Sequence, residues 1–302
     1  MQKSKFNAKR KNELIFYVCL LAIPLLQFTI FYIYVNINSI LLAFRQYDVL
    51  EGFSFVGLDN FKEVFRNISE DSIFRGSFGN TFLILGLGLL IGSTLPVVVS
   101  FYIYKKKFLS GFFRVVLFLP NIISTLVIVL AYKYFLEVAI PEIWSVFFGE
   151  KISGLLTNPN TDFLSVLFYN YWFGMGSGFL LYASTMSGIS DSVVESAELD
   201  GFTPLQEFFY ITLPLIFPTF VTFVVVNIST LFTNQINLFS IYSLYAPDSM
   251  MTVGYFLYRE TTRATLTGYP YLATLGILCT LVAVPLSLGL KYCLEKFGPS
   301  VE

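Results

Sequence analysis

The chain of 302 residues contains no histidine and only three cysteines. Without imidazole, the triads and dyads that use it and the histidine-ligated metal sites are excluded. Cys19, Cys279 and Cys293 lie in or beside apolar segments and show no metal-ligand spacing, so we interpret them as small buried hydrophobes. Charged residues make up only 13% of the chain. We therefore expect no catalytic site, no bound metal and no disulfide framework.

A phosphate-binding glycine loop is also absent. Gly86-Leu-Gly88 and Gly174-Met-Gly-Ser-Gly178 lie within apolar segments, and neither matches the G-x-x-x-x-G-K-[ST] pattern. We interpret them as sites where helices pack closely, with ligand contact as the alternative. No cofactor is expected on this chain. If ATP drives its activity, another chain must bind it.

Hydrophobic residues, in contrast, make up 55% of the sequence and aromatic residues 18%. About 20 apolar residues cross a bilayer core of roughly 30 Å as a helix. Six runs reach this length, at about 14–35, 81–104, 112–135, 163–186, 208–232 and 269–290. They predict an all-α integral membrane protein with six transmembrane helices. We divide it into a basic N-terminus (1–13), a membrane domain (14–292) and a tail (293–302).

The basic residues predict the orientation. With the N-terminus in the cytoplasm, eleven Lys and Arg residues fall on the inner side and seven on the outer side. The positive-inside rule then places both termini in the cytoplasm and makes the first run an uncleaved anchor. Lys133 lies near the outer end of the third run, where we expect it to snorkel.

The segment 189–214, between the fourth and fifth runs, has specific chemistry for a connecting loop. Ser192-Val-Val-Glu195 matches a capping box and predicts the start of a short helix, which Gly201 would end in a left-handed conformation. Thr203-Pro-Leu-Gln206 predicts a second helix start, and Pro214 should bend or break this helix. We expect a cytoplasmic elbow of two helices. Its five acidic residues and lack of Lys or Arg suggest a basic partner.

The spacing of this segment resembles a known signature. Glu195-Ser196-Ala197, Gly201 after three residues, and Ile211-Thr-Leu213-Pro214 after nine more are similar to the E-A-A-x3-G-x9-I-x-L-P pattern of permease subunits in binding-protein-dependent ABC importers. Ser196 replaces an alanine. The stretch 55–61, Asn80-Thr81 and Phe118-Leu-Pro120 resemble the carbohydrate branch, of the maltose and glycerol-3-phosphate type. The segment 245–250 departs from it, because it lacks the two glycines common in that branch.

The resemblance implies a subunit of a larger transporter in a prokaryotic cell membrane. Its partners would be a second homologous permease, two cytoplasmic ATPase subunits that hold ATP and Mg, and an external solute-binding protein. No nucleic-acid partner is implied. The elbow would contact the ATPase through the following residues: Glu195, Ser196, Ala197, Asp200, Gly201, Leu213 and Pro214. A purely structural role for Glu195, as the helix cap, is the alternative.

Polar residues inside the runs suggest a solute pathway. Asn227, Thr230, Asn234 and Asn237 recur at intervals of three and four, which predicts one polar face on the fifth helix. In the fourth run, Asn170, Gly174 and Ser177 share a face, and Asn170-Tyr-Trp172-Phe-Gly174 resembles the N-x-W-x-G stretch of maltose-type permeases. The resemblance adds Leu231 to the site, and Trp172 and Tyr171 could stack on sugar rings. Packing between helices is the alternative role of the amides.

Two other functions remain open from sequence alone. A secondary transporter or channel would predict inverted repeats and intramembrane carboxylates, and neither is evident. A non-transporting scaffold would need no coupling signature. The signature therefore favours the importer subunit. Polar uncharged residues outnumber charged ones in the spans, which favours a neutral sugar or oligosaccharide as the solute; a sugar acid that uses charges of the partner permease is the alternative.

Overall fold

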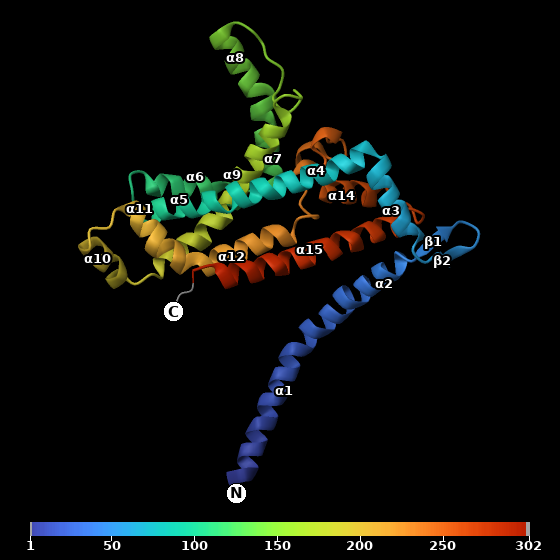
Figure 1. Cartoon of the computed structure of the whole chain (residues 1–302), viewed down its shortest axis with the longest axis horizontal. Helices are drawn as coiled ribbons and strands as arrows, with labels where there is room; N and C mark the ends of the chain where they lie inside the picture. Colours follow the sequence, from blue (N-terminus) through green and yellow to red (C-terminus); the bar gives the residue numbers. More distant parts are fainter. Residues whose placement is uncertain (1, 300–302) are drawn as a thin grey trace. The chain divides into compact units, whose positions relative to one another are not determined.

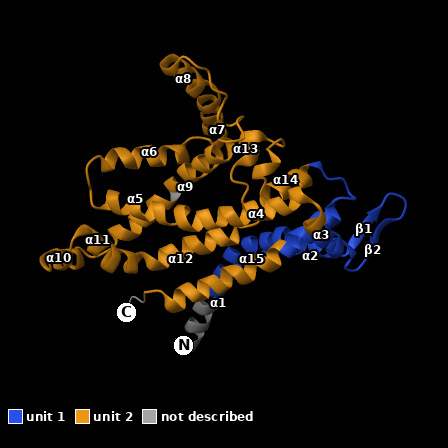
Figure 2. Cartoon of the chain, turned by 45° about the horizontal axis from the view of Figure 1, so that its top comes forward, with its two compact units in different colours: residues 1–66, 263–278 blue, residues 67–262, 279–302 orange. Residues whose placement is uncertain are grey.

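The computed structural model describes residues 2–299, with the side chains of residues 2–12 and of Ser177 outside that description (Figure 1). The chain divides into two compact units (Figure 2). Unit 1 comprises residues 1–66 and 263–278, and unit 2 comprises residues 67–262 and 279–302. The long helix α15 (Tyr269–Phe297) begins in the first unit and ends in the second.

Unit 1 begins with a long apolar helix, formed by α1 (Gln2–Phe28), the π-helical turn η1 (Thr29–Tyr34) and α2 (Val35–Leu42). A hairpin follows, in which β1 (Arg45–Asp48) pairs antiparallel with β2 (Gly52–Phe55). This hairpin corrects the all-α expectation. Gly52 takes a positive φ of 79°, which suits glycine at a tight turn. The Asn60 side chain donates to the carbonyls of Ala43 and Arg45 at 2.9 and 2.8 Å, which holds the hairpin against α3 (Asp59–Glu70).

Unit 2 contains the remaining elements. In chain order these are α4 (Ser72–Leu87), η2 (Gly88–Gly92), α5 (Thr94–Tyr104), α6 (Ser110–Ile122), α7 (Thr125–Tyr134), η3 (Phe135–Ala139), α8 (Ile140–Phe148), α9 (Asp162–Ser187), α10 (Asp191–Leu199), α11 (Pro204–Glu207), η4 (Phe208–Thr212), α12 (Leu213–Ser229), α13 (Leu238–Tyr242), η5 (Asp248–Met250) and α14 (Val253–Arg263). Helix α9 packs against α5, α6 and α12 and so forms the centre of this unit.

The third predicted run, 112–135, is not one straight helix. Helix α6 ends at Ile122, and the following helix turns away from it by 109°. Pro120 weakens the last turn of α6 because it donates no N–H, and Ile123 and Ser124 then take extended backbone angles. Figure 1 shows α7 and α8 leaving the bundle formed by α5, α6 and α9.

Lys133 has a hydrogen-bond partner on another helix of the chain. Its ammonium group donates to the carbonyl oxygen of Ile241 at 2.7 Å, and its side chain is partly buried. A cation at the last carbonyls of α13 is favourable because these groups carry the negative end of the helix dipole. Lys133 therefore holds α7 to α13, and its snorkelling at the membrane surface stays a prediction.

Within residues 2–299, four helices are long and apolar enough to cross a membrane: Glu13–Leu42, Ser72–Tyr104, Pro204–Ser229 and Tyr269–Phe297. The bent pair that begins with α6 would bring the number to five. Helix α9 covers the fourth predicted run but is not among these helices, since it carries polar residues and glycines at its centre. The chain is thus a multi-pass membrane protein, and the count of six spans stays a prediction.

Gly176 tests the close approach of α9 to α6. A Cβ at this position would lie 2.5 Å from the carbonyl oxygen of Leu117 and 2.1 Å from Nδ2 of Asn121. We expect Gly176→Ala to force the helices apart and to lower the stability of the fold by about 1–3 kcal/mol. Thermal unfolding in detergent would measure the change. Gly86→Ala is the matched control, because nothing lies within 4 Å of its added Cβ; equal melting temperatures for both variants would contradict the packing.

Candidate functional site

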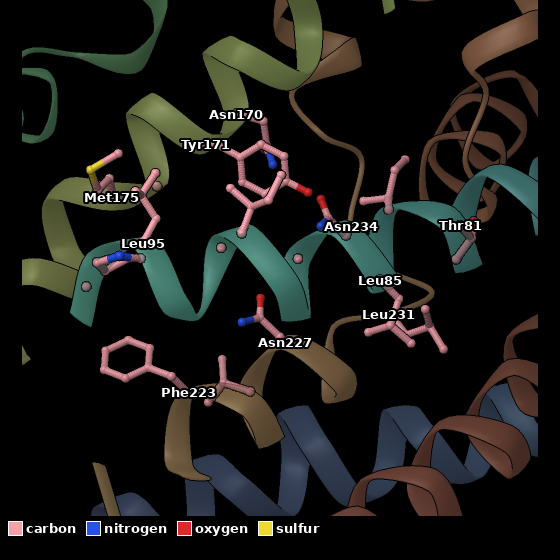
Figure 3. A pocket seen from close by; sticks show the side chains of 18 of the residues that line it. Thr81, Leu85, Leu95, Asn170, Tyr171, Met175, Phe223, Asn227, Leu231 and Asn234 are labelled. Atoms are coloured by element: carbon pink, nitrogen blue, oxygen red, sulfur yellow. The ribbon is translucent and has the colours of Figure 1, made fainter. Parts of the chain in front are cut away.

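A cavity of about 270 Å³ lies within unit 2, between the α4–α5 segment, α9, α12 and the loop after α12 (Figure 3). It is lined by the following residues: Thr81, Ile84, Leu85, Gly88, Ile91, Gly92, Leu95, Pro96, Asn170, Tyr171, Gly174, Met175, Gly178, Tyr182, Phe223, Val226, Asn227, Leu231, Asn234 and Thr252. None of these lining residues carries a charge. Their polar groups are amides, phenols and threonine hydroxyls, which suit an uncharged hydroxylated solute.

Three amides from two helices and one loop meet at this cavity. Figure 3 shows Asn170 from α9 and Asn227 from α12 reaching the α4–α5 segment from different sides. Asn227 donates to the hydroxyl of Ser93 at 3.2 Å, and Asn170 accepts from Asn237 at 3.1 Å. Each bond uses part of the hydrogen-bonding capacity of an amide, which has one acceptor oxygen and two N–H donors. The side chains are therefore oriented by the fold while retaining groups for a ligand.

Asn234 reaches the cavity by a different route from the one the spacing predicted. Helix α12 ends at Ser229, so the polar residues from 227 to 237 do not form one helical face. The chain turns back because Ile236 and Asn237 take positive φ angles of 43° and 58°. The Oδ1 of Asn234 accepts from the Ile236 N–H at 2.8 Å, and the backbone carbonyl of Asn234 accepts from the Thr252 hydroxyl at 2.9 Å.

The other predicted pathway residues divide between the cavity and its surroundings. Gly174 and Leu231 line the cavity, as expected. Thr230 does not, because its hydroxyl bonds to the carbonyls of Val226 and Asn227 in its own helix. Trp172 also lies outside it and packs on the hydrophobic cluster around Tyr169. The side chain of Ser177 lies outside the described residues.

The α4–α5 segment contributes a wall that sequence reasoning missed. Its glycines are at the π-helical turn η2, where Gly88 and Gly92 leave room for the cavity and for Tyr171. A Cβ on Gly92 would lie 3.3 Å from the Tyr171 ring. The sequence carried a signal in these glycines, but we interpreted Gly86-Leu-Gly88 first as a packing site, with ligand contact as the alternative. Gly178 does have that role, since its added Cβ would lie 3.2 Å from Pro96.

Two phenols at the cavity have hydroxyl groups without a partner among the described residues. Both Tyr171 and Tyr182 line the cavity, and Tyr182 is 1% exposed. A buried hydroxyl that makes no hydrogen bond is unfavourable by about 1–3 kcal/mol. A ligand group that reached either hydroxyl would remove this cost.

The predicted elbow is present as two short helices, α10 and α11. Gly201 between them has the expected positive φ of 79°, and the second capping box is confirmed, since Thr203 and Gln206 exchange their hydrogen bonds. The first capping box is wrong: α10 begins at Asp191, so Ser192 lies inside the helix and Ser190 is its N-cap. The Ser192 hydroxyl contacts that of Ser190 at 2.7 Å instead.

Pro214 does not break the helix that leaves the elbow. The π-helical turn η4 precedes it, and the Leu213 N–H bonds to the carbonyl of Phe208, five residues back. The wider turn accommodates a residue without an N–H, so helix Pro204–Ser229 continues. Leu213 packs on a cluster that includes Tyr182 and Ile216. The same cluster thus joins the elbow to a residue that lines the cavity.

The remaining elbow residues differ in what they present to a partner. Glu195, Ser196 and Asp200 are exposed, whereas Ala197 is 4% exposed and packs inside this chain. The Ser196 hydroxyl donates to the carbonyl of Ser192 at 2.7 Å. Glu207 is 3% exposed and therefore does not belong to the acidic surface.

Comparison with known proteins gives the family. The model of the binding-protein-dependent transport system inner membrane component matches residues 84–296. The chain is 30% identical to the probable ABC transporter permease protein YurN of Bacillus subtilis over 216 residues, 68% of this chain and 70% of the relative. It is 24% identical over 253 residues to the multiple sugar-binding transport system permease protein MsmF of Streptococcus mutans, 82% and 85% of the two chains.

A solved structure has the same fold. A chain of a bacterial ABC transporter involved in the import of the acidic polysaccharide alginate superposes with a TM-score of 0.80 at 23% identity, over 97% of this chain and 99% of that chain. The family match covers more than half of the sequence and includes the cavity residues from Ile84 onward and the whole elbow. The protein described here is therefore a member of the family of inner membrane components of binding-protein-dependent transport systems.

Proposed function

We propose that this chain is the permease subunit of an ATP-driven importer that takes up a neutral sugar or oligosaccharide. Membership of the family supports transport that depends on a binding protein. The relative MsmF is named as a sugar-binding transport system permease. The pore is formed with a second homologous permease, and the solute passes through it by alternating access.

The cavity is the observation that carries the choice of solute. Its amides and phenols can donate to and accept from sugar hydroxyls, and its aliphatic and aromatic walls can contact the apolar faces of the rings. An acidic solute would need cationic groups or other compensation in the membrane interior, because an unpaired buried charge is very unfavourable. The uncharged lining therefore supports a neutral solute.

The proposed assembly places ATP and Mg on two cytoplasmic ATPase subunits that contact the exposed acidic residues of α10 and the following turn. An external solute-binding protein delivers the sugar on the opposite side. Six spans and cytoplasmic termini complete the arrangement. The basic residues Lys106 and Lys107 follow α5 and are exposed. Lys105, directly before them, forms an ion pair with Glu207 in the elbow region. This contact supports placing the basic end of α5 and the elbow on the same side of the membrane.

The choice of solute can be tested by uptake. In proteoliposomes that contain the permease pair, the ATPases and the binding protein, a neutral trisaccharide panel should include a substrate. Hexuronate trisaccharides should be transported at least 10-fold more slowly, because the cavity offers no cation. Uptake that favours the hexuronate would overturn the neutral-sugar proposal. Uptake that persists with an inactivated ATPase would instead favour a secondary transporter or channel, and no uptake of any solute would favour a scaffold.

Tyr171 provides a test of solute contact. Tyr171→Phe removes only the hydroxyl, and we expect the KM for uptake to rise about 3- to 10-fold, the equivalent of one hydrogen bond of about 1 kcal/mol. Tyr169→Phe is the matched control: its hydroxyl also has no partner among the described residues, but it lies in a hydrophobic cluster and does not line the cavity. Equal effects of the two substitutions would contradict a contact with the solute.

Glu195 can now be tested as a charge instead of a helix cap. Because Ser190 is the N-cap and Ser192 lies inside α10, the capping explanation loses its support. We expect Glu195→Gln to lower ATP-dependent uptake about 3- to 10-fold, since one charge-assisted contact contributes about 1.5 kcal/mol or less once it is partly solvated. Ser192→Ala is the control and should leave uptake unchanged. Normal co-purification and uptake with Glu195→Gln would exclude a role for the carboxylate charge.

A further inference from the structure

A buried ion pair connects α5 to the elbow. The ammonium nitrogen of Lys105 lies 2.7 Å from Oε2 of Glu207, and the two side chains are 16% and 5% exposed. The same ammonium lies 3.7 Å from Oε1 of Glu198, whose side chain is 65% exposed. Lys105 is the C-cap of α5, Glu198 belongs to α10 and Glu207 ends α11. One cation therefore contacts both helices of the elbow.

Apolar contacts surround this ion pair and limit its access to water. The rings of Phe101 on α5 and Phe208 beside Glu207 have centroids 4.9 Å apart. Val97 and Phe208 belong to one hydrophobic cluster with Ile216 on α12. Leu95 and Pro96, which directly precede Val97 on α5, line the cavity. Packed side chains therefore connect the elbow to the cavity wall without a break, so a movement of the elbow can displace that wall.

The pair is poorly explained by stability alone. Desolvation of two charges offsets most of their attraction, and replacing a buried pair with apolar residues is often neutral or stabilising. Here the cost is higher, because Oε1 of Glu207 has no hydrogen-bond partner among the described residues. A single well-satisfied resting state would pair both oxygens. In this structure Oε1 of Glu207 is instead buried without a donor among the described residues.

We propose that Lys105 and Glu207 are positioning residues that make α5, and with it the cavity wall, follow the elbow when the ATPases move. This inference rests on the proposed function as an ATP-driven importer. In this proposal the ion pair fixes the orientation of α5 relative to the elbow, because the contact between the rings of Phe101 and Phe208 is less directional than a hydrogen-bonded charge pair. Breaking the ion pair should therefore lower the amount of sugar taken up per ATP hydrolysed, even in complexes that still assemble.

The test uses the whole complex in proteoliposomes and measures sugar uptake per ATP hydrolysed, with the neutral trisaccharide identified for the wild type. Lys105→Met and Glu207→Gln should each lower this ratio at least 10-fold. The exchange Lys105→Glu with Glu207→Lys should restore it to within about 3-fold, the range expected for a re-formed but imperfect pair. Lys107→Met is the control, since Lys107 is exposed on the same loop, and it should leave the ratio unchanged.

A second measurement, of the distance between the end of α5 and α10, tests the inference in variants whose uptake is low because they assemble poorly. Spin labels at Lys107 and Leu199, both exposed, report the distance between the end of α5 and α10 without and with ATP. In the wild type this distance should stay constant, and in Lys105→Met with Glu207→Leu it should broaden or change. An apolar pair with a wild-type ratio and a constant distance would overturn the inference. A wild-type complex without ATP-dependent uptake would instead overturn the proposed function.

Discussion

Every polar group inside a bilayer must find a partner in the protein or in a hydrated cavity, and this constraint organises unit 2. Asn170 and Asn227 each take one partner from another segment, and the groups that remain face the same cavity. Lys133, which does not line this cavity, donates a hydrogen bond from its ammonium group to the Ile241 carbonyl. Amide groups left over from these contacts therefore gather at the cavity, whereas the Tyr169 hydroxyl and Oε1 of Glu207 lack a partner elsewhere among the described residues.

Three departures from regular α-helix shape unit 2: the π-helical turns η2 and η4, and the break after Ile122. The π-helical turn η2 places glycines beside the cavity, and η4 accommodates Pro214 so that one helix runs from the elbow into the membrane. The break after Ile122 turns α7 away from α6 by 109°. In each case a residue that lacks a side chain or an N–H lies at or next to the departure, which links the irregularity to the sequence.

The elbow combines an exposed acidic surface with a buried acidic anchor. Glu195 and Asp200 are exposed, whereas Glu207 pairs with Lys105 inside the fold. These carboxylates are indistinguishable in sequence because each lies in the same short polar segment. Burial separates them, since a carboxylate in contact with solvent can meet a partner chain and one packed among aromatic rings can only contact its own chain.

The sequence by itself determined the membrane class, the family signature, the second capping box and the left-handed Gly201, because each depends on composition or on residue types at short, fixed spacings within one segment. It also indicated Asn170, Gly174, Asn227, Leu231 and Asn234, which do line the cavity. Only the tertiary structure decided that α12 stops at Ser229, that Trp172 packs against the hydrophobic cluster around Tyr169 and that Tyr171, Tyr182 and the α4–α5 glycines complete the wall. It likewise paired Lys105 with Glu207 across about a hundred residues of chain. Such pairings depend on which segments pack together, and a local pattern carries no record of its distant neighbours.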